Sequence, residues 1–180
     1  ALANPPDYDR ARAVALFSAV MRDLVHQFKY ADAHHARNRF GHWLVVAGAD
    51  PIAGCDLVMP VPMHPRRLLA RRFNQAAILA REVARLEGKA FAPDLLRRTR
   101  ATRSQIGLTN AQRRTNVTGA FRLARGAEER ITGRRVLLVD DVITTGATIN
   151  ACARTLKRAG ATSVDALALA IRPPGSTMVL

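Results

Sequence analysis

Short apolar runs alternate along the chain with longer segments whose apolar residues recur every three or four positions. Brief runs rich in aliphatic residues predict strands at 57–62, 120–123, 135–140 and 163–171. Helical spacing of the apolar residues predicts amphipathic helices at 20–30, 36–47, 76–86 and 149–159. The run at 11–17 fits either a strand or the start of a helix. This alternation predicts an α/β protein with a parallel sheet and crossover helices.

Helix-breaking and polar residues separate these elements. Pro51 is expected to end the second helix, Gly88 the third and Gly160 the fourth. Residues 99–116 have no long apolar period and are expected to form a long loop, of a kind that is usually functional or mobile. Ligands of parallel sheets bind beyond the carboxyl ends of the strands. We therefore expect three segments to share one neighbourhood, namely 62–67, 99–116 and 140–148.

The chain carries a large excess of positive charge. It has 28 basic and 14 acidic residues, a net charge of +14, and all but three of the basic residues are Arg. Two explanations of this composition are equally good: an Arg-rich coding bias, or a surface that attracts phosphates or nucleic acid. Composition alone does not decide between them, because it does not localise the charge. The 180 residues fit one domain spanning 1–180, with residues 1–50 as a candidate hood or N-terminal extension.

Several classes of protein are disfavoured by the sequence. Cys55 and Cys152 lie far apart without metal-ligand spacing, so neither a zinc site nor a disulfide framework is predicted. No run of about twenty apolar residues and no signal peptide is visible, which indicates a cytoplasmic protein without membrane insertion. The sequence begins with Ala1 rather than Met, so we expect the natural N-terminus to lie further upstream.

The main candidate site follows the apolar run at 136–139. Asp140 and Asp141 come next, then a short Thr/Gly turn, and then the apolar spacing of a helix. A strand, a tight loop and a helix start in this order direct backbone N–H groups and the positive end of the helix dipole at one point, which suits a phosphate. We predict that the phosphate cradle consists of Thr144, Thr145, Gly146, Ala147 and Thr148.

The acid pair makes this loop more than a general anion site. Carboxylates repel a bare phosphate, so Asp140 and Asp141 need sugar hydroxyls or a cation as partners. Neighbouring strand residues point to opposite faces, and we therefore expect the strand to end at the acids, so that both carboxylates can converge. The alternative is a polar turn without a ligand. Neither a Gly-Lys-Ser/Thr phosphate loop nor a G-x-G-x-x-G motif is present here.

Two Arg-rich segments accompany this motif. A strand end and a Pro-framed turn lead into Arg66 and Arg67, whose guanidinium groups match the oxygens of a pyrophosphate. His64 in this turn is a pyrophosphate contact or, as we favour, a hydrogen-bonded loop histidine, and Asn74 is a ligand contact or a helix cap. The second segment, 97–116, is expected to be a mobile lid over a diphosphate, with a strip that contacts nucleic acid or a solvated basic loop as the alternatives.

The acid pair with its Thr/Gly turn resembles the phosphoribosyl-pyrophosphate (PRPP) signature of the type I phosphoribosyltransferases. The wider set of motifs is similar to the ComF family, phosphoribosyltransferase-like proteins associated with natural competence. The resemblance rests on Asn4-Pro5-Pro6, Phe28-Lys29-Tyr30, 60–67, Phe73-Asn74-Gln75, 104–108, 113–117 and 140–148. It implies a three-layer type I phosphoribosyltransferase fold, in which helices flank a parallel sheet.

The resemblance also implies roles for particular residues. Asp140 and Asp141 would be the catalytic ribose acids, and residues 144–148 would wrap the 5-phosphate of PRPP, which binds together with Mg²⁺. By position, the pyrophosphate loop would comprise Met63, His64, Arg66 and Arg67. No side chain is assigned as a protein ligand of a metal. Family members usually carry an N-terminal four-cysteine zinc module, absent here, and a Gly where this chain has Arg72.

Three functions fit this sequence. The first is a PRPP-dependent glycosyltransferase, in which a nitrogen nucleophile attacks C1 of the ribose and pyrophosphate leaves. The second is a single-stranded DNA-binding protein for DNA uptake that uses the fold as a scaffold. It would rely on phosphate contacts, because no aromatic residue lies in 99–116. The third is a regulator that binds PRPP or a nucleotide and contacts a partner protein. Expected partners are PRPP or a related ribose phosphate, single-stranded DNA, and a second copy of the chain (a homodimer) or the DNA-uptake machinery.

Overall fold

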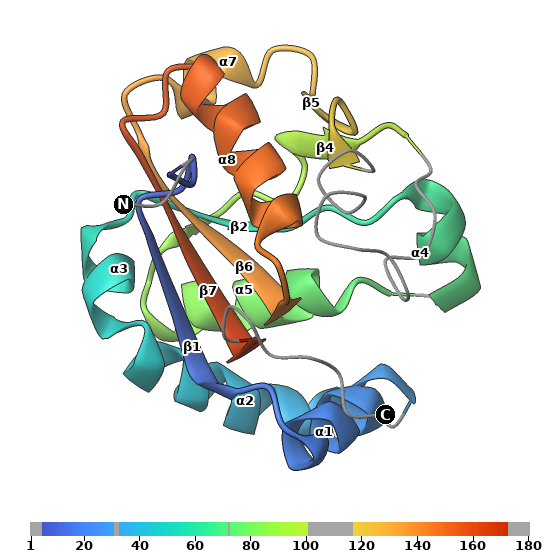
Figure 1. Ribbon diagram of the computed structural model, residues 1–180. Coiled ribbons are helices and arrows are strands. Elements are labelled where there is room, and N and C mark those ends of the chain that lie inside the picture. Colours follow the sequence, from blue (N-terminus) through green and yellow to red (C-terminus); the bar gives the residue numbers. More distant parts are fainter. Residues whose placement is uncertain (1–4, 31–32, 72, 101–116, 173–180) are drawn as a thin grey trace.

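The computed structural model describes residues 5–30, 33–71, 73–100 and 117–172 (Figure 1). A five-stranded sheet with the order β1-β7-β6-β2-β3 lies at its centre, and all of its strand pairs are parallel. Its strands are β1 (Arg10–Leu16), β2 (Leu57–Pro60), β3 (Ala90–Phe91), β6 (Arg135–Ile143) and β7 (Ser163–Ile171). A separate antiparallel hairpin is formed by β4 (Leu96–Arg98) and β5 (Phe121–Leu123).

Helices cover both faces of the sheet and give the fold three layers (Figure 1). The helix α8 packs on one face beside the β4–β5 hairpin, whereas α2 and α5 pack on the other. The helices are α1 (Ala19–Tyr30), α2 (Ala33–Ala47), α3 (Ala49–Gly54), α4 (Pro65–Arg71), α5 (Gln75–Leu86), α7 (Glu128–Ile131) and α8 (Ala147–Arg158). The predicted α/β class, with a parallel sheet between helices, is confirmed. Among the described residues, no helix combines the length and apolar character that crossing a bilayer requires.

The central strand β6 separates two apolar cores, because its side chains alternate between the two faces of the sheet. Val136 and Leu138 belong to the core beneath α8, and Leu137 and Val139 belong to the core beneath α5. All four side chains are buried, as expected for a central strand of a parallel sheet. Cys152 of α8 is fully buried in the first of these cores, so the prediction that it is a core residue is confirmed.

The sequence-based boundaries hold approximately for the four long helices and for β7, whereas β6 continues past its expected end and several short elements were not expected. The ambiguous run at 11–17 is the edge strand β1, which pairs with β7 along its length. The helix α2 ends at Ala47, as expected, and Pro51 lies in the first turn of the next helix, α3, where its missing N–H costs no intrahelical bond. The Arg residues expected at the Pro-framed turn after β2 belong to a helix instead, since Pro65 begins α4.

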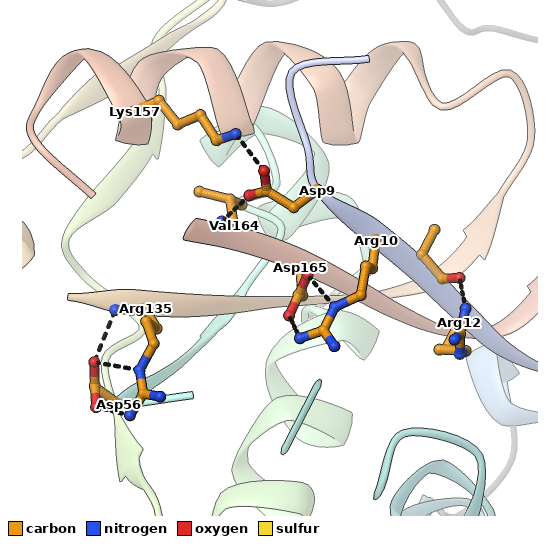
Figure 2. A network of polar contacts seen from close by, with 9 residues as sticks. Asp9, Arg10, Arg12, Asp56, Arg135, Lys157, Val164 and Asp165 are labelled. Carbon is orange, nitrogen blue, oxygen red and sulfur yellow. Dashed lines mark hydrogen bonds and ion pairs between the residues drawn. The ribbon is translucent and has the colours of Figure 1, made fainter. Parts of the chain in front are cut away.

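Ion pairs fasten the amino-terminal ends of the strands (Figure 2). Arg10 of β1 donates two hydrogen bonds, of 2.6 and 3.1 Å, to the nearly buried carboxylate of Asp165 in β7. Asp56, just before β2, pairs with Arg135 of β6 at 3.1 Å. Hydrogen bonds from the Arg135 side chain and backbone lower the pKa of Asp56 to about 2. These contacts lie at the end of the sheet opposite to the acid pair of β6.

Candidate functional site

The candidate site lies where the connections of the sheet diverge. From β2 the chain crosses through α5 to β3, and from β6 it crosses through α8 to β7 on the other side. Because β2 and β6 are neighbours, their carboxyl ends form a switch point, which is where open α/β sheets bind ligands. The Val61 N–H donates to the Val139 carbonyl at 2.9 Å, so the chain leaves β2 beside Asp140.

Two of the three segments that were expected to meet therefore begin at adjacent strand ends. The segment 62–67 follows β2 and the segment 140–148 follows the central part of β6. Most of the third segment, residues 101–116, lies outside the described residues. Its two flanks are described and pair with each other as β4 and β5.

Asp140 and Asp141 lie inside β6 rather than at its end, because pairing with β7 continues to Ile143. The expectation that the strand ends at the acids is therefore wrong. The alternation of side chains nevertheless shifts by one position at the acids, since Val139 and Val142 pack in the same core although they are an odd number of residues apart. Both acids are half-buried at this irregularity in the strand.

Each of the two carboxylates accepts a hydrogen bond from the backbone N–H that follows it. The Asp141 N–H donates to Asp140 Oδ1 at 2.9 Å, and the Val142 N–H donates to Asp141 Oδ1 at 2.8 Å. The pKa of the nearby Cys152 thiol responds to the charge of Asp140. Burial raises the pKa of this thiol well above its usual value, the Asp140 carboxylate raises it further, and the Arg98 guanidinium lowers it. Asp140 is two residues beyond Leu138, which packs in the core beneath α8, so its side chain lies toward the α8 face as well.

The turn after β6 has the backbone of an anion-binding loop. Residues 144–146 form a bend, and Gly146 is the N-cap of α8 with a left-handed φ of 71°. Thr145 Oγ1 accepts a long hydrogen bond of 3.4 Å from the Ala147 N–H. The Gly146 carbonyl accepts the first helical bond, from the Asn150 N–H at 2.8 Å. The predicted cradle therefore has the expected order of strand, bend and helix start.

The charges along α8 agree with its dipole. Its first turn contains no acidic residue, whereas Lys157 and Arg158 lie in its last turn. The N–H groups in the first turn of a helix have no intrahelical partners. A helix of 12 residues that begins just beyond the acid pair thus presents its positive end at the carboxyl edge of the sheet.

A side-chain cap organises the start of α5. Asn74 Oδ1 accepts a hydrogen bond from the Ala76 N–H at 3.1 Å, and Asn74 Nδ2 donates to the Val61 carbonyl at 3.1 Å. The helix-cap alternative for Asn74 is therefore confirmed. By bonding to Val61, this side chain also fixes the segment that leaves β2 relative to α5.

The predicted pyrophosphate residues lie between β2 and α5 in the sequence. His64 Nδ1 accepts a hydrogen bond from the Arg66 N–H at 3.2 Å, which makes it the hydrogen-bonded loop histidine favoured above. Met63 is half-buried and Arg66 is exposed at the start of α4. The side chain of Arg67 lies outside the described residues. Contact of any of the four with a pyrophosphate stays a prediction.

One residue at the turn was missed by the sequence analysis. The Tyr8 hydroxyl oxygen lies 3.3 Å from the position that a Cβ atom would take on Gly146. Tyr8 is half-buried and packs against the core beneath α8. No local pattern could have revealed this contact, because it joins segments near opposite ends of the sequence.

The donor chemistry of the acid pair fits a magnesium ion that arrives with a ligand. Mg²⁺ is usually held through one or two carboxylates and the phosphates of a substrate. In the described part of the chain, no group of three His, Cys, Asp or Glu side chains could hold an ion by itself. The oxygen atoms of Asp140 and Asp141 therefore suit a cation shared with a diphosphate better than one caged by the protein.

Known sequences define the family of this chain. The profile of the phosphoribosyl transferase domain matches residues 75–179, more than half of the chain. The chain therefore belongs to the phosphoribosyltransferase family. Its relatives include the DNA utilization protein YhgH of Escherichia coli O157:H7, 33% identical over 169 residues that cover 91% of this chain and 73% of that protein. Competence protein F of Haemophilus influenzae Rd is 29% identical over 174 residues, covering 94% and 76%. The resemblance to the ComF family is confirmed.

Solved structures share the fold. The allosteric regulatory enzyme of purine biosynthesis superposes with a TM-score of 0.52 and 27% identity, covering 77% of this chain and 26% of that chain. Glutamine PRPP amidotransferase from B. subtilis, with a TM-score of 0.51, 24% identity and coverage of 77% and 27%, supports the fold alone. This chain thus spans about a quarter of each structure. The predicted type I phosphoribosyltransferase fold is confirmed.

Proposed function

We propose that the protein binds PRPP, or a closely related ribose phosphate, at the turn between β6 and α8 and transfers the ribose phosphate to a nitrogen nucleophile. One observation carries the proposal: two half-buried acids are followed, a few residues later, by a left-handed glycine that caps a helix. The helix start suits a 5-phosphate, and the acids suit the ribose 2- and 3-hydroxyls. A ribose phosphate therefore accounts for both parts of the motif.

Each group has a separate part in the proposed reaction. The backbone around Gly146 anchors the 5-phosphate, so that binding energy remote from C1 orients the reacting carbon. Asp140 and Asp141 accept hydrogen bonds from the ribose hydroxyls, and their negative charge favours the positive charge that develops at C1. His64 and Arg66, where the chain from β2 enters α4, contact the leaving pyrophosphate. When bound with PRPP, Mg²⁺ supplies charge neutralisation on the diphosphate.

The transfer step forms a bond between C1 and the nitrogen of the nucleophile and breaks the bond between C1 and the pyrophosphate oxygen. The electron pair of the broken bond leaves with the pyrophosphate, and the nitrogen gives up a proton to solvent. Ammonia and nitrogen bases are both candidate acceptors. We place this reaction in the cytoplasm.

Calorimetry on the full chain tests the binding step. With Mg²⁺ present, we expect PRPP and ribose 5-phosphate to bind, and PRPP to bind more tightly because it adds a diphosphate. Ribose without a phosphate is expected to give no heat of binding. No binding of PRPP would contradict the proposed site.

A separate assay tests the transfer step. Pyrophosphate release from PRPP is measured with ammonia and with a panel of bases, and release at background would restrict the function to binding.

The β4–β5 hairpin favours a second function, the binding of single-stranded DNA. Arg97 and Arg122 are directly opposite each other on the two strands, and both are exposed. Like charges at opposed positions destabilise a strand pair, and neither guanidinium forms an ion pair within the described chain. An anionic partner would relieve this repulsion. Because relatives are named for DNA utilization and for competence, we propose nucleic acid as that partner.

Replacing Arg97 and Arg122 together by Gln is expected to lower the affinity for a single-stranded oligonucleotide. The affinity of the variant should also depend less steeply on the salt concentration. Two lost phosphate contacts lower the slope of log affinity against log salt by about 1.4. Fluorescence anisotropy with a labelled oligonucleotide at several salt concentrations measures this slope. The charge-matched control is Arg12→Gln with Arg39→Gln, two exposed residues of β1 and α2. Binding that is indifferent to salt, or absent at low salt, would remove the DNA function.

A further inference from the structure

The segment Asp7–Asp9, just before β1, is tied to α8 and β7. The Asp9 carboxylate accepts hydrogen bonds from Lys157 Nζ of α8 at 2.7 Å and from the Val164 N–H of β7 at 2.8 Å (Figure 2). The Asp9 N–H in turn donates to the Val164 carbonyl at 2.8 Å. This end of the segment is therefore fixed against both the sheet and the last turn of α8.

Asp7 continues these contacts along α8 toward its start. Its carboxylate pairs with Arg154 at 2.8 Å, and its N–H donates to the side-chain oxygen of Asn150. Lys157, Arg154 and Asn150 succeed one another at intervals of three and four residues, so they line one side of the helix. The segment thus runs along this side of α8 toward Gly146.

Tyr8 lies between the two anchored acids, and its side chain reaches the turn. Its hydroxyl oxygen, Cε1 and Cζ lie 3.3, 3.6 and 3.9 Å from the Cβ position of Gly146. The ring is half-buried against the core beneath α8. Within the described residues the hydroxyl has no hydrogen-bond partner, so the contact with the turn is one of packing.

The turn needs such support because of its glycine. Gly146 is held at a φ of 71°, yet a glycine can adopt many other conformations, and the hydrogen bond from the Ala147 N–H to Thr145 Oγ1 in this turn is long, at 3.4 Å. We propose that Tyr8 is a positioning residue, whose ring restricts Gly146 so that the backbone N–H groups of the turn keep converging on one point. The inference rests on the anion-binding role proposed above for this turn.

Hydrogen exchange on the full chain without ligand tests the positioning role directly. Tyr8→Ala is expected to accelerate exchange of the backbone amides in 144–150 about tenfold, because the turn opens more often. Tyr8→Phe keeps the ring and is expected to exchange like the wild type. Phe91→Ala is the matched control, since Phe91 is a partly buried aromatic residue of β3 at the other edge of the sheet. It is expected to leave exchange in 144–150 unchanged.

Calorimetry with ribose 5-phosphate gives the second measurement. We expect Tyr8→Ala to bind about tenfold more weakly, and Tyr8→Phe and Phe91→Ala to bind like the wild type. The inference is overturned if Tyr8→Ala exchanges like the wild type, or if Tyr8→Phe loses as much as Tyr8→Ala, which would make the hydroxyl a direct contact. If the wild type binds no ribose phosphate but Tyr8→Ala still accelerates exchange, the proposed function fails and the positioning role stands.

Discussion

Replacing Gly146 by Val is expected to lower the affinity for both ribose 5-phosphate and inorganic phosphate by about a hundredfold while the sheet stays folded. Gly146 has a φ of 71°, a region that β-branched residues avoid and that costs an L-residue about 1–2 kcal/mol. A Cβ at this position would also lie 3.3 Å from the Tyr8 hydroxyl oxygen. The turn is expected to leave its left-handed shape, so that its N–H groups no longer converge. Calorimetry with the two ligands measures the loss.

Gly133→Val is the matched control for this substitution. Gly133 has a φ of 75°, with no heavy atom within 4 Å of its Cβ position, and it lies between α7 and the amino end of β6. We expect similar backbone strain and a similar fall in Tm, but unchanged phosphate binding. If both variants lose binding equally, stability rather than the geometry of the turn controls affinity. Retained binding in Gly146→Val would contradict the proposed role of the turn.

The strand, turn and helix of the candidate site could be predicted because each has a local cause. The apolar run at 136–139 needs burial on both faces of a sheet, and Gly146 permits the left-handed bend. The helical spacing of Ile149, Cys152 and Leu156 places all three in the core. The ComF-type motifs then identified the family, which single-residue chemistry could not have done.

The features that the sequence analysis missed depend on contacts between distant segments or on very short elements. The strand continues past the acid pair because β7 pairs with Val142 and Ile143, a condition that the residues around Asp140 do not reveal. Tyr8 reaches Gly146 from a segment that Asp7 and Asp9 fasten to α8, far from Gly146 in the sequence. The elements β3, β4, α3 and α4 have two to seven residues, too few for a period to appear.

Replacing Asp140 and Asp141 together by Asn is expected to separate recognition of the ribose from recognition of the phosphate. Asn keeps a carbonyl oxygen that can accept the backbone N–H bonds of 2.9 and 2.8 Å, so the strand geometry is retained. Hydrogen bonds to charged groups contribute about 1.5–3 kcal/mol, against about 1 kcal/mol for neutral ones. We therefore expect the affinity for ribose 5-phosphate and PRPP to fall about tenfold in the double variant.

Inorganic phosphate is expected to respond in the opposite direction. The double variant removes two negative charges beside the turn, and phosphate should therefore bind as tightly as before or more tightly. Asp50→Asn with Asp94→Asn is the charge-matched control, since both of these acids are exposed, Asp50 in α3 and Asp94 in the bend between β3 and β4. It is expected to leave both ligands unaffected. Unchanged binding of ribose 5-phosphate in the acid-pair variant would contradict its proposed contact with the sugar.

The contrast between the two substitutions bears on the whole proposal. Gly146→Val is expected to lose both ligands, because both depend on the N–H groups of the turn. The acid-pair variant is expected to lose only the ligand that contains ribose. General destabilisation cannot produce this difference, because unfolding lowers the apparent affinity for every ligand of the folded state together. A variant set in which the two ligands always change in parallel would therefore mean that Asp140 and Asp141 do not contact the sugar.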